Sequence, residues 1–308
     1  MASICLLTPS YSGDIQRFSL LRRSVSTFAP GIPHLAIVHS EDCAEFGDRF
    51  RGEPGLEIVA TRDVLPRSIE RRRRKSGPSW IARGWRRQRT IKGWHAQQFS
   101  KIFALAECRF EAAVFLDSDV FVCRPLSSDY FYINGLLKLF RRRATNAEQL
   151  DYDIATHDIL GDPLHTITEL YDYIFHPSCF RRSSALSLLR EFGRRGLARR
   201  EKWMRRFLRE NRPSEYNLLG YAATVLEGLA GYHLVECEPE ELHHSIRYPE
   251  DRLRVAEEIE SMRARPKPFA LIQSTLGVRF EQISEAFDRL VEAHSGTPAR
   301  PVPETPVR

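Results

Sequence analysis

Four short motifs that identify common enzyme classes are missing from this sequence. It contains no Gly-x-Gly-x-x-Gly, no phosphate loop ending in Gly-Lys-Ser or Gly-Lys-Thr, no His-Glu-x-x-His and no Gly-x-Ser-x-Gly. Each motif supplies the backbone turn, metal ligands or nucleophile that one type of reaction requires. Their absence argues against the commonest dehydrogenase, kinase, zinc-protease and serine-hydrolase mechanisms.

Long apolar runs and paired cysteines are also missing. No apolar stretch approaches the ~20 residues that span a bilayer, and the first nine residues carry no basic leader of a signal peptide. The six cysteines show no Cys-x-x-Cys spacing, and several lie inside apolar segments, as buried free thiols do in a reducing compartment. We therefore expect a cytoplasmic protein without a zinc site or a disulfide framework.

Hydrophobic residues make up 42% of the 308 residues, enough for a substantial core in one large domain or two small ones. We see no internal repeat and no clear linker, which favours a single domain over residues 1–294. Residues 295–308 contain four prolines and are predicted to be a disordered tail.

The net charge of +6 is concentrated in two basic segments. Residues 67–92 combine many arginines with Trp80 and Trp85, and form either a solvated insertion or a surface for an anionic glycan, a nucleotide or an anionic membrane. Residues 194–209 form a basic helix with Trp203 and Phe207 on one face, which is either an ordinary amphipathic surface helix or a helix that lies on a membrane.

Apolar spacing in the first half alternates between strand and helix patterns. The predicted strands are residues 3–8, 33–39, 56–60 and 112–122, and the predicted helices are residues 14–28 and 96–108. This alternation predicts an α/β fold with a mixed, mainly parallel sheet flanked by helices. The loops after three strands (residues 8–11, 40–42 and 117–119) are expected to meet at one rim, where such sheets bind ligands.

The second half gives weaker signals. Strands are predicted at residues 151–156, 171–175 and 268–273, and helices from Ser183 or Ser184 to 195 and at 279–293. Ser214 is a plausible N-cap of a further helix, with Glu215 in its first turn.

The most informative segment is residues 112–122, where Asp117 and Asp119 interrupt an apolar run. In an extended chain both side chains leave the same face, and two hard oxygen ligands suit Mg²⁺ or Mn²⁺ bridging a diphosphate. A turn made by Asp-Ser-Asp is the simpler alternative. A phosphatase of the haloacid-dehalogenase type also uses Asp-x-Asp, but it begins with that strand and has Thr or Val where this chain has Phe121.

Five segments together resemble a bacterial group of glycosyltransferase-like proteins with the GT-A fold. They are Thr8-Pro9-Ser10-Tyr11, Gly93-Trp94-x-x-Gln97-Gln98-x-x-Lys101, Leu116-Asp117-Ser118-Asp119, Ser214-Glu215-Tyr216 with Gly220, and Ile272-Gln273-Ser274. The resemblance implies a Rossmann-like half that binds a nucleotide sugar (residues 1–126, with the basic insertion 67–92) and an acceptor half (residues 127–294).

The resemblance also implies roles for individual residues. The donor would contact a set drawn from three loops and one helix: Thr8, Pro9, Ser10, Tyr11, Lys101, Asp117, Ser118 and Asp119. Asp119 is the expected direct ligand of Mn²⁺ or Mg²⁺, Asp117 would bind the metal, the ribose or a metal-bound water, and His244 or His243 would be a further ligand. The alternative for His243 and His244 is that they are ordinary surface histidines without a metal. The alternative for Lys101 is that it is a solvent-exposed lysine on a helix.

Glu215 is the candidate general base, because a base must take the proton from the acceptor hydroxyl. If it has this role, inversion at the anomeric carbon follows; its alternative is a first-turn glutamate favoured by the helix dipole. His176 and Tyr216 are expected at the acceptor cleft. Asp14 and the pair Glu41-Asp42 are candidate contacts to the nucleoside.

We therefore predict a glycosyltransferase that moves a sugar from a nucleoside-diphosphate sugar, with a UDP-sugar favoured, to a hydroxyl of a glycan or lipid-linked acceptor. Peripheral contact with the inner face of the membrane through the basic segments is part of this prediction, and nucleic acid is not an expected partner. The alternatives are a sugar-nucleotide nucleotidyltransferase, the phosphatase, and a non-catalytic RNA- or membrane-binding protein. The nucleotidyltransferase normally has a glycine-rich loop after its first strand, where this chain has only Gly13.

Overall fold

A computed structural model describes residues 3–75, 91, 93–162, 169–246, 257, 261, 264, 267–273 and 278–295. Its central sheet has the order β3-β2-β1-β4-β9. The strands are β1 (Ile4–Ser10), β2 (His34–Val38), β3 (Leu56–Ala60), β4 (Ala112–Phe115) and β9 (Ser178–Arg181). The first four are parallel and β9 is antiparallel to β4. The predicted α/β class, with a mixed and mainly parallel sheet, is confirmed.

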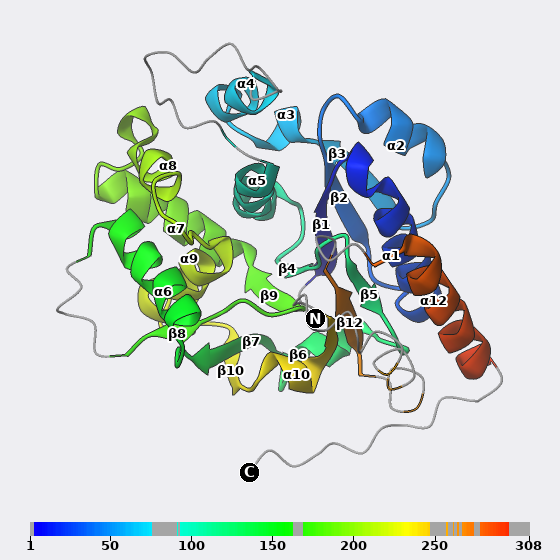
Figure 1. The fold of residues 1–308 in the computed structure, drawn as a ribbon. Coiled ribbons are helices and arrows are strands. Elements are labelled where there is room, and N and C mark those ends of the chain that lie inside the picture. The colour runs from blue at the N-terminus through cyan, green and yellow to red at the C-terminus, as the bar shows by residue number, and fades with distance from the viewer. Residues whose placement is uncertain are drawn as a thin grey trace.

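Helices cover both faces of this sheet (Figure 1). On one face lie α1 (Ile15–Phe28), α2 (Cys43–Arg49) and α12 (Phe280–Ser295). On the other lies α5 (Gly93–Glu107), with α7 (Arg182–Arg194) and α9 (Glu215–Tyr221) beyond it. The short helices α3 (Thr61–Val64) and α4 (Arg67–Lys75) follow β3. The spacing of Phe18, Leu21, Val25 and Phe28 predicts the buried face of α1, and all four are buried.

The predicted strand over residues 112–122 is instead two strands in two sheets. After β4 the chain turns at Asp117, where the Val120 N–H donates to the Asp117 carbonyl at 3.0 Å. It then forms β5 (Val120–Val122), which pairs with β12 (Phe269–Ile272), and β12 pairs with β11 (His243–Ile246). Asp and Ser favour such turns because their side chains compete for backbone hydrogen bonds. The prediction that the chain is extended through Asp117-Ser118-Asp119 is therefore wrong, because the backbone turns there; the metal role of the two aspartates stays a prediction.

A further sheet belongs to the second half, in the order β10-β7-β6, with β8 also paired to β7. Its strands are β10 (Tyr232–Glu236), β7 (Leu136–Arg143), β6 (Tyr132–Ile133) and β8 (Tyr171–Asp172). The other α-helices whose bounds the structure describes are α6 (Ala147–Leu160), α8 (Lys202–Phe207) and α10 (Pro239–Leu242). Short 3₁₀ segments are η1 (Ser12–Asp14), η3 (Ser128–Phe131) and η5 (Arg199–Glu201), and η6 (Ala222–Leu226) is a π-helix.

The strand predicted at residues 151–156 is wrong, because these residues lie in α6. Asn146 and Gln149 form a reciprocal capping box at its start, and Gly161 ends it in the left-handed conformation (φ 80°). The β-branched residues inside this segment disfavour a helix, but the capping box and the terminal glycine favour it more strongly. The strand predicted at 171–175 is also shorter, and ends at Asp172.

One cluster of buried apolar side chains extends from β1 to α12 and so includes residues of both predicted halves. The proposed division of the chain at residue 126 stays a prediction. The prolines of the predicted tail, and residues 76–90 and 92 of the basic insertion, lie outside the described residues. Within the described part, no helix has the length and apolar character needed to cross a membrane.

Candidate functional site

The loops that follow β1, β2 and β4 meet at one rim of the central sheet. The Ser12 N–H donates to Asp42 Oδ2 at 2.9 Å, which joins the first loop to the second. Ser118 Oγ donates to Asp14 Oδ2 at 3.2 Å, which joins the first loop to the third. The predicted meeting of these loops is confirmed, and it follows from the parallel order of the three strands.

The predicted donor contacts in the first of these loops differ in where they lie: two are inside β1, and two are at its end or beyond it. Thr8 and Pro9 are buried within β1, and Thr8 Oγ1 lies 3.0 Å from His34 Nε2 inside the sheet. Ser10 is the last residue of β1, and Tyr11 beyond it is 38% exposed, with its ring 5.5 Å from that of His39. The geometry therefore leaves Ser10 and Tyr11 as the better candidates for contact with a ligand.

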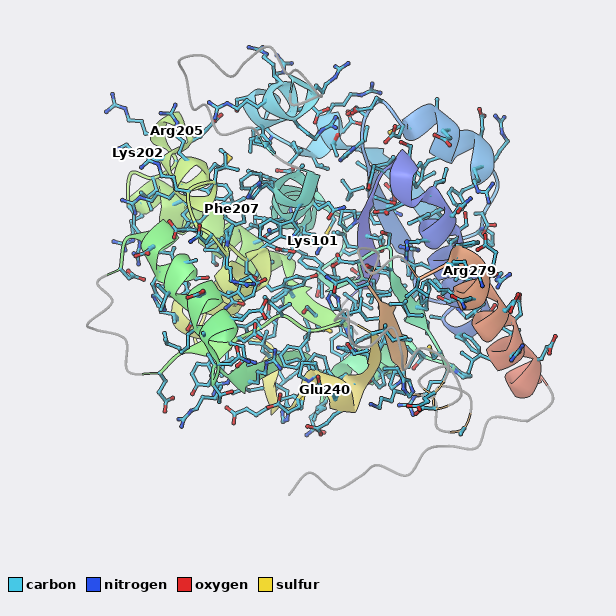
Figure 2. The ribbon with its side chains drawn as sticks, in the orientation of Figure 1. Lys101, Lys202, Arg205, Phe207, Glu240 and Arg279 are labelled. Carbon is cyan, nitrogen blue, oxygen red and sulfur yellow. The ribbon has the colours of Figure 1, made fainter. Side chains whose placement is uncertain are left out.

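Lys101 is the centre of the site. It lies on α5, near the middle of the molecule, and its side chain is only 3% exposed (Figure 2). Its Nζ is 2.7 Å from Asp117 Oδ1 and 2.8 Å from Glu215 Oε1, and it donates to the Tyr216 hydroxyl at 2.7 Å. An ammonium has three protons, so these contacts account for all of them. The alternative of a solvent-exposed helix lysine is wrong.

The charges of this cluster support one another. Burial lowers the pKa of Lys101, but the carboxylates of Asp117 and Glu215 raise it well above its usual value. Burial raises the pKa of Asp117, but Lys101 and His176 bring it below the usual value. Burial outweighs Lys101 at Glu215, whose pKa is raised. Lys101 therefore stays protonated and holds Asp117 as a carboxylate.

Two predicted acceptor residues border the same carboxylate. His176 Nε2 is 4.0 Å from Asp117 Oδ2, and the His176 ring is 6.0 Å from the ring of Tyr216. The side chain of Asp117 is 34% exposed, whereas those of Lys101 and His176 are 3% and 7% exposed. Asp117 is therefore the member of this group that solvent reaches most easily.

Glu215 lies in the interior. Its side chain is 2% exposed, its carboxylate binds Lys101, and its backbone N–H donates to Gln98 Oε1 at 3.1 Å. Ser214 is the N-cap of α9, as predicted, and its Oγ accepts from the Asn217 N–H. A general base must reach the hydroxyl that it deprotonates. The geometry thus favours the alternative in which Glu215 has a structural position at the start of α9.

The predicted metal ligands are distributed differently from the expectation. His244 is buried, and its Nε2 accepts from the Lys267 N–H at 3.2 Å. His243 is also buried, with its ring 6.2 Å from that of His176, so neither is a surface histidine. Among the described residues no three His, Cys, Asp or Glu side chains form a group that could hold a metal, so Asp117, Asp119 and His244 do not form one.

A two-carboxylate site still fits the chemistry of the expected cation. Mg²⁺ is usually bound by one or two carboxylates together with substrate phosphates, and it keeps several waters. Asp119 is partly exposed in the turn after β4, and its neighbour Ser118 donates to Asp14 of the rim. The Asp119 carboxylate stays the predicted direct ligand, while Asp117 Oδ1 binds Lys101.

A family comparison covers nearly the whole chain. Residues 2–295 match the model of a family described as a family of unknown function, DUF6492. The chain belongs to the DUF6492 family. A comparison with curated proteins gave no match.

Solved structures resemble this DUF6492 chain only weakly. The glycosyltransferase GlyE of Streptococcus pneumoniae TIGR4, in its apo form, matches with a TM-score of 0.47 and 11% identity over 96% of this chain. The match covers 64% of the GlyE chain, so the protein spans less than two thirds of that relative. The galactosyltransferase LgtC, in complex with donor and acceptor sugar analogues, gives a TM-score of 0.45 and 10% identity over 97% of each chain. The bifunctional glycosyltransferase WbbM gives 0.44 and 9% over 96% of this chain and 51% of its own. Similarity at this level does not establish the activity of the DUF6492 chain.

Sequence patterns did not assign a role to Gln98, which the structure adds to the site. Its Oε1 receives the Glu215 N–H, while its buried Nε2 has no hydrogen-bond partner in the described part of the chain. The buried Ser10 Oγ, at the end of β1, likewise has no hydrogen-bond partner among the described residues. The pair Gln97-Gln98 is visible in the sequence, but which of the two faces the sheet depends on the phase of α5 and on α9, a distant segment.

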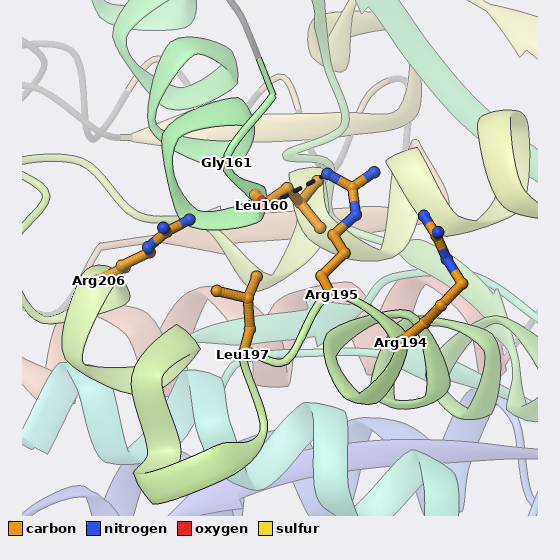
Figure 3. Close-up of a pocket in the computed structure, with 6 residues that line it drawn as sticks. All are labelled: Leu160, Gly161, Arg194, Arg195, Leu197 and Arg206. Carbon is orange, nitrogen blue, oxygen red and sulfur yellow. Dashed lines mark hydrogen bonds between the residues drawn. The ribbon is translucent and has the colours of Figure 1, made fainter.

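A pocket of about 480 Å³ lies away from this rim, at the ends of α6, α7 and α8 (Figure 3). Three arginines line it, but they have structural partners. Arg195 Nη1 donates to the Leu160 carbonyl at 3.1 Å, and Arg206 Nη1 donates to the carbonyls of Asp158 and Ile159. Arg194 binds Glu191. These contacts stabilise the carboxyl ends of α6 and α7, and the pocket contains none of the predicted site residues.

Proposed function

We propose that this protein is a metal-dependent glycosyltransferase with a GT-A-type architecture. It would transfer a sugar from a nucleoside-diphosphate sugar, with a UDP-sugar favoured, to a hydroxyl of a glycan or lipid-linked acceptor. One observation carries the proposal: the loops after β1, β2 and β4 meet at one rim, and the third of them carries Asp117, whose carboxylate is fixed by the buried Lys101. The sequence resemblance to this enzyme group involves the same residues.

The donor would lie at the rim formed by these loops. Parallel sheets bind nucleotides outside the carboxyl ends of their strands. The buried Ser10 Oγ has no partner among the described residues and so retains a hydrogen bond for a ligand. Tyr11 offers an exposed aromatic face, and Asp14 and Asp42 offer carboxylates from the loops after β1 and β2.

Asp119, together with the exposed edge of Asp117, would hold Mn²⁺ or Mg²⁺ against the donor diphosphate. The chemistry that such a cation supplies is neutralisation of the negative charge that grows on the diphosphate as the glycosidic bond breaks. Lys101 keeps Asp117 ionised and in one orientation through a 2.7 Å contact. The preorganised charge of this cluster would be present before the donor arrives, which is the arrangement that lowers a barrier most.

His176 and Tyr216 would lie on the acceptor side of Asp117. We assign Glu215 to the support of Lys101, because its carboxylate is buried against the ammonium. The inverting mechanism with Glu215 as base stays a separate prediction. In that case Glu215→Gln would spare donor binding and slow transfer by about 10²-fold or more. A near-normal rate would assign Glu215 to support alone.

The test is a thermal-shift experiment with UDP, GDP, CMP and ADP, each with and without Mn²⁺. A ligand at about 100 times its dissociation constant stabilises the native state by ~2.7 kcal/mol, a shift of a few degrees for a domain of this size. We expect a Mn²⁺-dependent shift with UDP. Asp119→Asn should lose the shift and the transferase activity while it keeps the fold.

Asp129→Asn is the matched control, because Asp129 is an exposed aspartate on η3 outside the rim. It should keep the full shift. Cooperative melting with no shift from any nucleotide would contradict the proposal. An unchanged shift in Asp119→Asn would contradict the metal assignment alone.

A further inference from the structure

Two basic segments that are distant in sequence lie side by side in the structure. Ser68 Oγ on α4 donates to the Glu201 carboxylate on η5, and Arg72 Nη2 lies 3.7 Å from the same carboxylate. Glu201 directly precedes α8, and α4 and α8 occupy the same end of the molecule (Figure 1). Residues 67–75 of the first basic segment and residues 199–209 of the second therefore contribute to one surface.

The helix α8 presents its charges outward. Trp203, Met204 and Phe207 are buried, and Trp203 stacks on Phe192 of α7 with ring centroids 4.5 Å apart. Lys202 and Arg205, three residues apart on the helix, are exposed, and Figure 2 shows both at the outer edge of the molecule. The packing of α8 therefore needs its apolar side chains but not these two charges.

Several exposed charges of this surface have no ion-pair partner among the described residues, whereas Arg72 lies close to Glu201. In the part of the chain that the structure describes, no ion pair joins an acidic group to any of five exposed basic residues. They are Arg71, Arg74, Arg199, Lys202 and Arg205. Arg206, by contrast, donates to the carbonyl groups of α6, and Arg73 is buried between Glu41 and Glu70. The five residues thus leave a net positive surface.

An exposed tryptophan lies beside these charges. Trp94, at the start of α5, is 46% exposed, and its ring contacts His95, whose own ring packs 6.3 Å from Phe207 of α8. Basic residues combined with tryptophan are typical of surfaces that bind anionic membranes.

We propose that the surface formed by Arg71, Arg74, Trp94, Arg199, Lys202 and Arg205, here called the basic face, docks onto an anionic lipid bilayer. The helix α5 connects this face to the site, because Lys101 follows Trp94 by seven residues, about 10 Å along a helix. A bilayer at the basic face would bring lipid-linked molecules close to Asp117. The preference for a bilayer over a nucleic acid rests on the exposed Trp94 beside the basic residues, and the link to Asp117 rests on the proposed function.

Cosedimentation with lipid vesicles tests the proposal without any measurement of activity. One set of vesicles contains phosphatidylcholine alone, and the other also contains phosphatidylglycerol. The test variant is Lys202→Glu/Arg205→Glu. The matched control is Arg279→Glu/Arg289→Glu, which changes the net charge equally through exposed residues before and on α12, across the molecule from α8 (Figure 2).

We expect the unaltered protein to sediment only with the anionic vesicles and to be released by salt, since exposed charges are screened. The test variant should bind them about 10-fold or more weakly, because each basic residue near an anionic surface contributes to attraction. The control should bind as the unaltered protein does. Far-ultraviolet circular dichroism and the nucleotide thermal shift should be unchanged in both variants, which separates this proposal from the proposed function.

Three results would overturn the proposal. Equal binding to neutral and anionic vesicles would exclude recognition by charge. An equal loss in the test and control variants would mean that net charge, not the basic face, governs binding. Absence of vesicle binding, together with Lys202- and Arg205-dependent binding of a single-stranded RNA, would assign the basic face to a nucleic acid.

Discussion

Replacement of Lys101 by methionine should destabilise the protein in a manner that depends on pH. Methionine has a similar length but no charge, so Glu215 would lose the ammonium that lies 2.8 Å from its Oε1. The Glu215 side chain is 2% exposed, and water cannot replace the lost partner. Asp117 is 34% exposed and can be hydrated instead. The penalty should therefore come mainly from Glu215.

The size of this penalty follows from the protonation of Glu215. A buried carboxylate without a partner takes up a proton and becomes neutral. The cost is the free energy of keeping Glu215 protonated at a pH above 4.5, the usual pKa of its carboxyl group. At pH 7 this cost is at most about 3 kcal/mol and at pH 5 at most about 1 kcal/mol, because the pKa of Glu215 is already raised in the unaltered protein. The loss at pH 7 agrees with the ~3–5 kcal/mol typical of breaking a buried ion pair.

Urea unfolding followed by tryptophan fluorescence measures these free energies at both pH values. The double variant Lys101→Met/Glu215→Gln should recover about 2 kcal/mol at pH 7 relative to Lys101→Met, since it removes the isolated carboxylate. It should also lose most of the pH dependence. Lys202→Met is the control, and as an exposed substitution it should change stability by no more than about 0.5 kcal/mol.

The reasoning would be refuted if Lys101→Met cost the same at pH 5 and pH 7. It would also fail if the losses of the two single variants simply added in the double variant, because additivity means that the side chains are not coupled.

Two further predictions concern stability. Burial raises the pKa of Asp153 from 3.8 to about 6, although the Tyr171 N–H, which donates to its carboxylate, lowers it. The native state therefore holds the Asp153 proton more tightly than the unfolded state does. Stability is therefore lost as the pH rises from about 4 to 6, by up to about 3 kcal/mol. The variant Asp153→Asn, whose Oδ1 can still accept from the Tyr171 N–H, should raise the melting temperature at pH 7.5 and leave it unchanged near pH 4. A higher melting temperature at pH 4 would contradict the assignment. A Cβ on Gly220 would lie 2.3 Å from Tyr173 Cγ, so Gly220→Ala should lower stability by about 1–3 kcal/mol in urea unfolding, whereas Gly193→Ala, with open space around its Cβ, should cost little.

The sequence predicted the elements whose signals are local. The alternation of strand and helix in the first half depends on short apolar patterns, and the Ser214 cap depends on a residue type at a single position. The signals failed where two local tendencies compete. At residues 151–156 the capping box of Asn146 determined the structure, and at Asp117 the turn tendency of Asp and Ser did so.

The site itself could be predicted only in part. The sequence identified Lys101, Asp117 and Glu215, but the contact of Lys101 with Glu215 joins residues 114 positions apart. No spacing rule gives a contact at that separation, because it depends on the packing of α9 against α5. The burial of Glu215, which weakens its assignment as a base, is a property of that packing and not of its immediate neighbours.

The turn between β4 and β5 connects two sheets. Asp117 lies close to the central sheet, and Asp119 lies close to the sheet that contains β12. Leu116, next to Asp117, donates its N–H to the Leu7 carbonyl in β1, while the Asp119 carbonyl accepts from the Ile272 N–H in β12. The turn that carries the two carboxylates is thus anchored at one end to β1 and at the other to β12. A strand about 150 residues further along the chain, β12, therefore helps to hold a motif that its own immediate sequence does not fix alone.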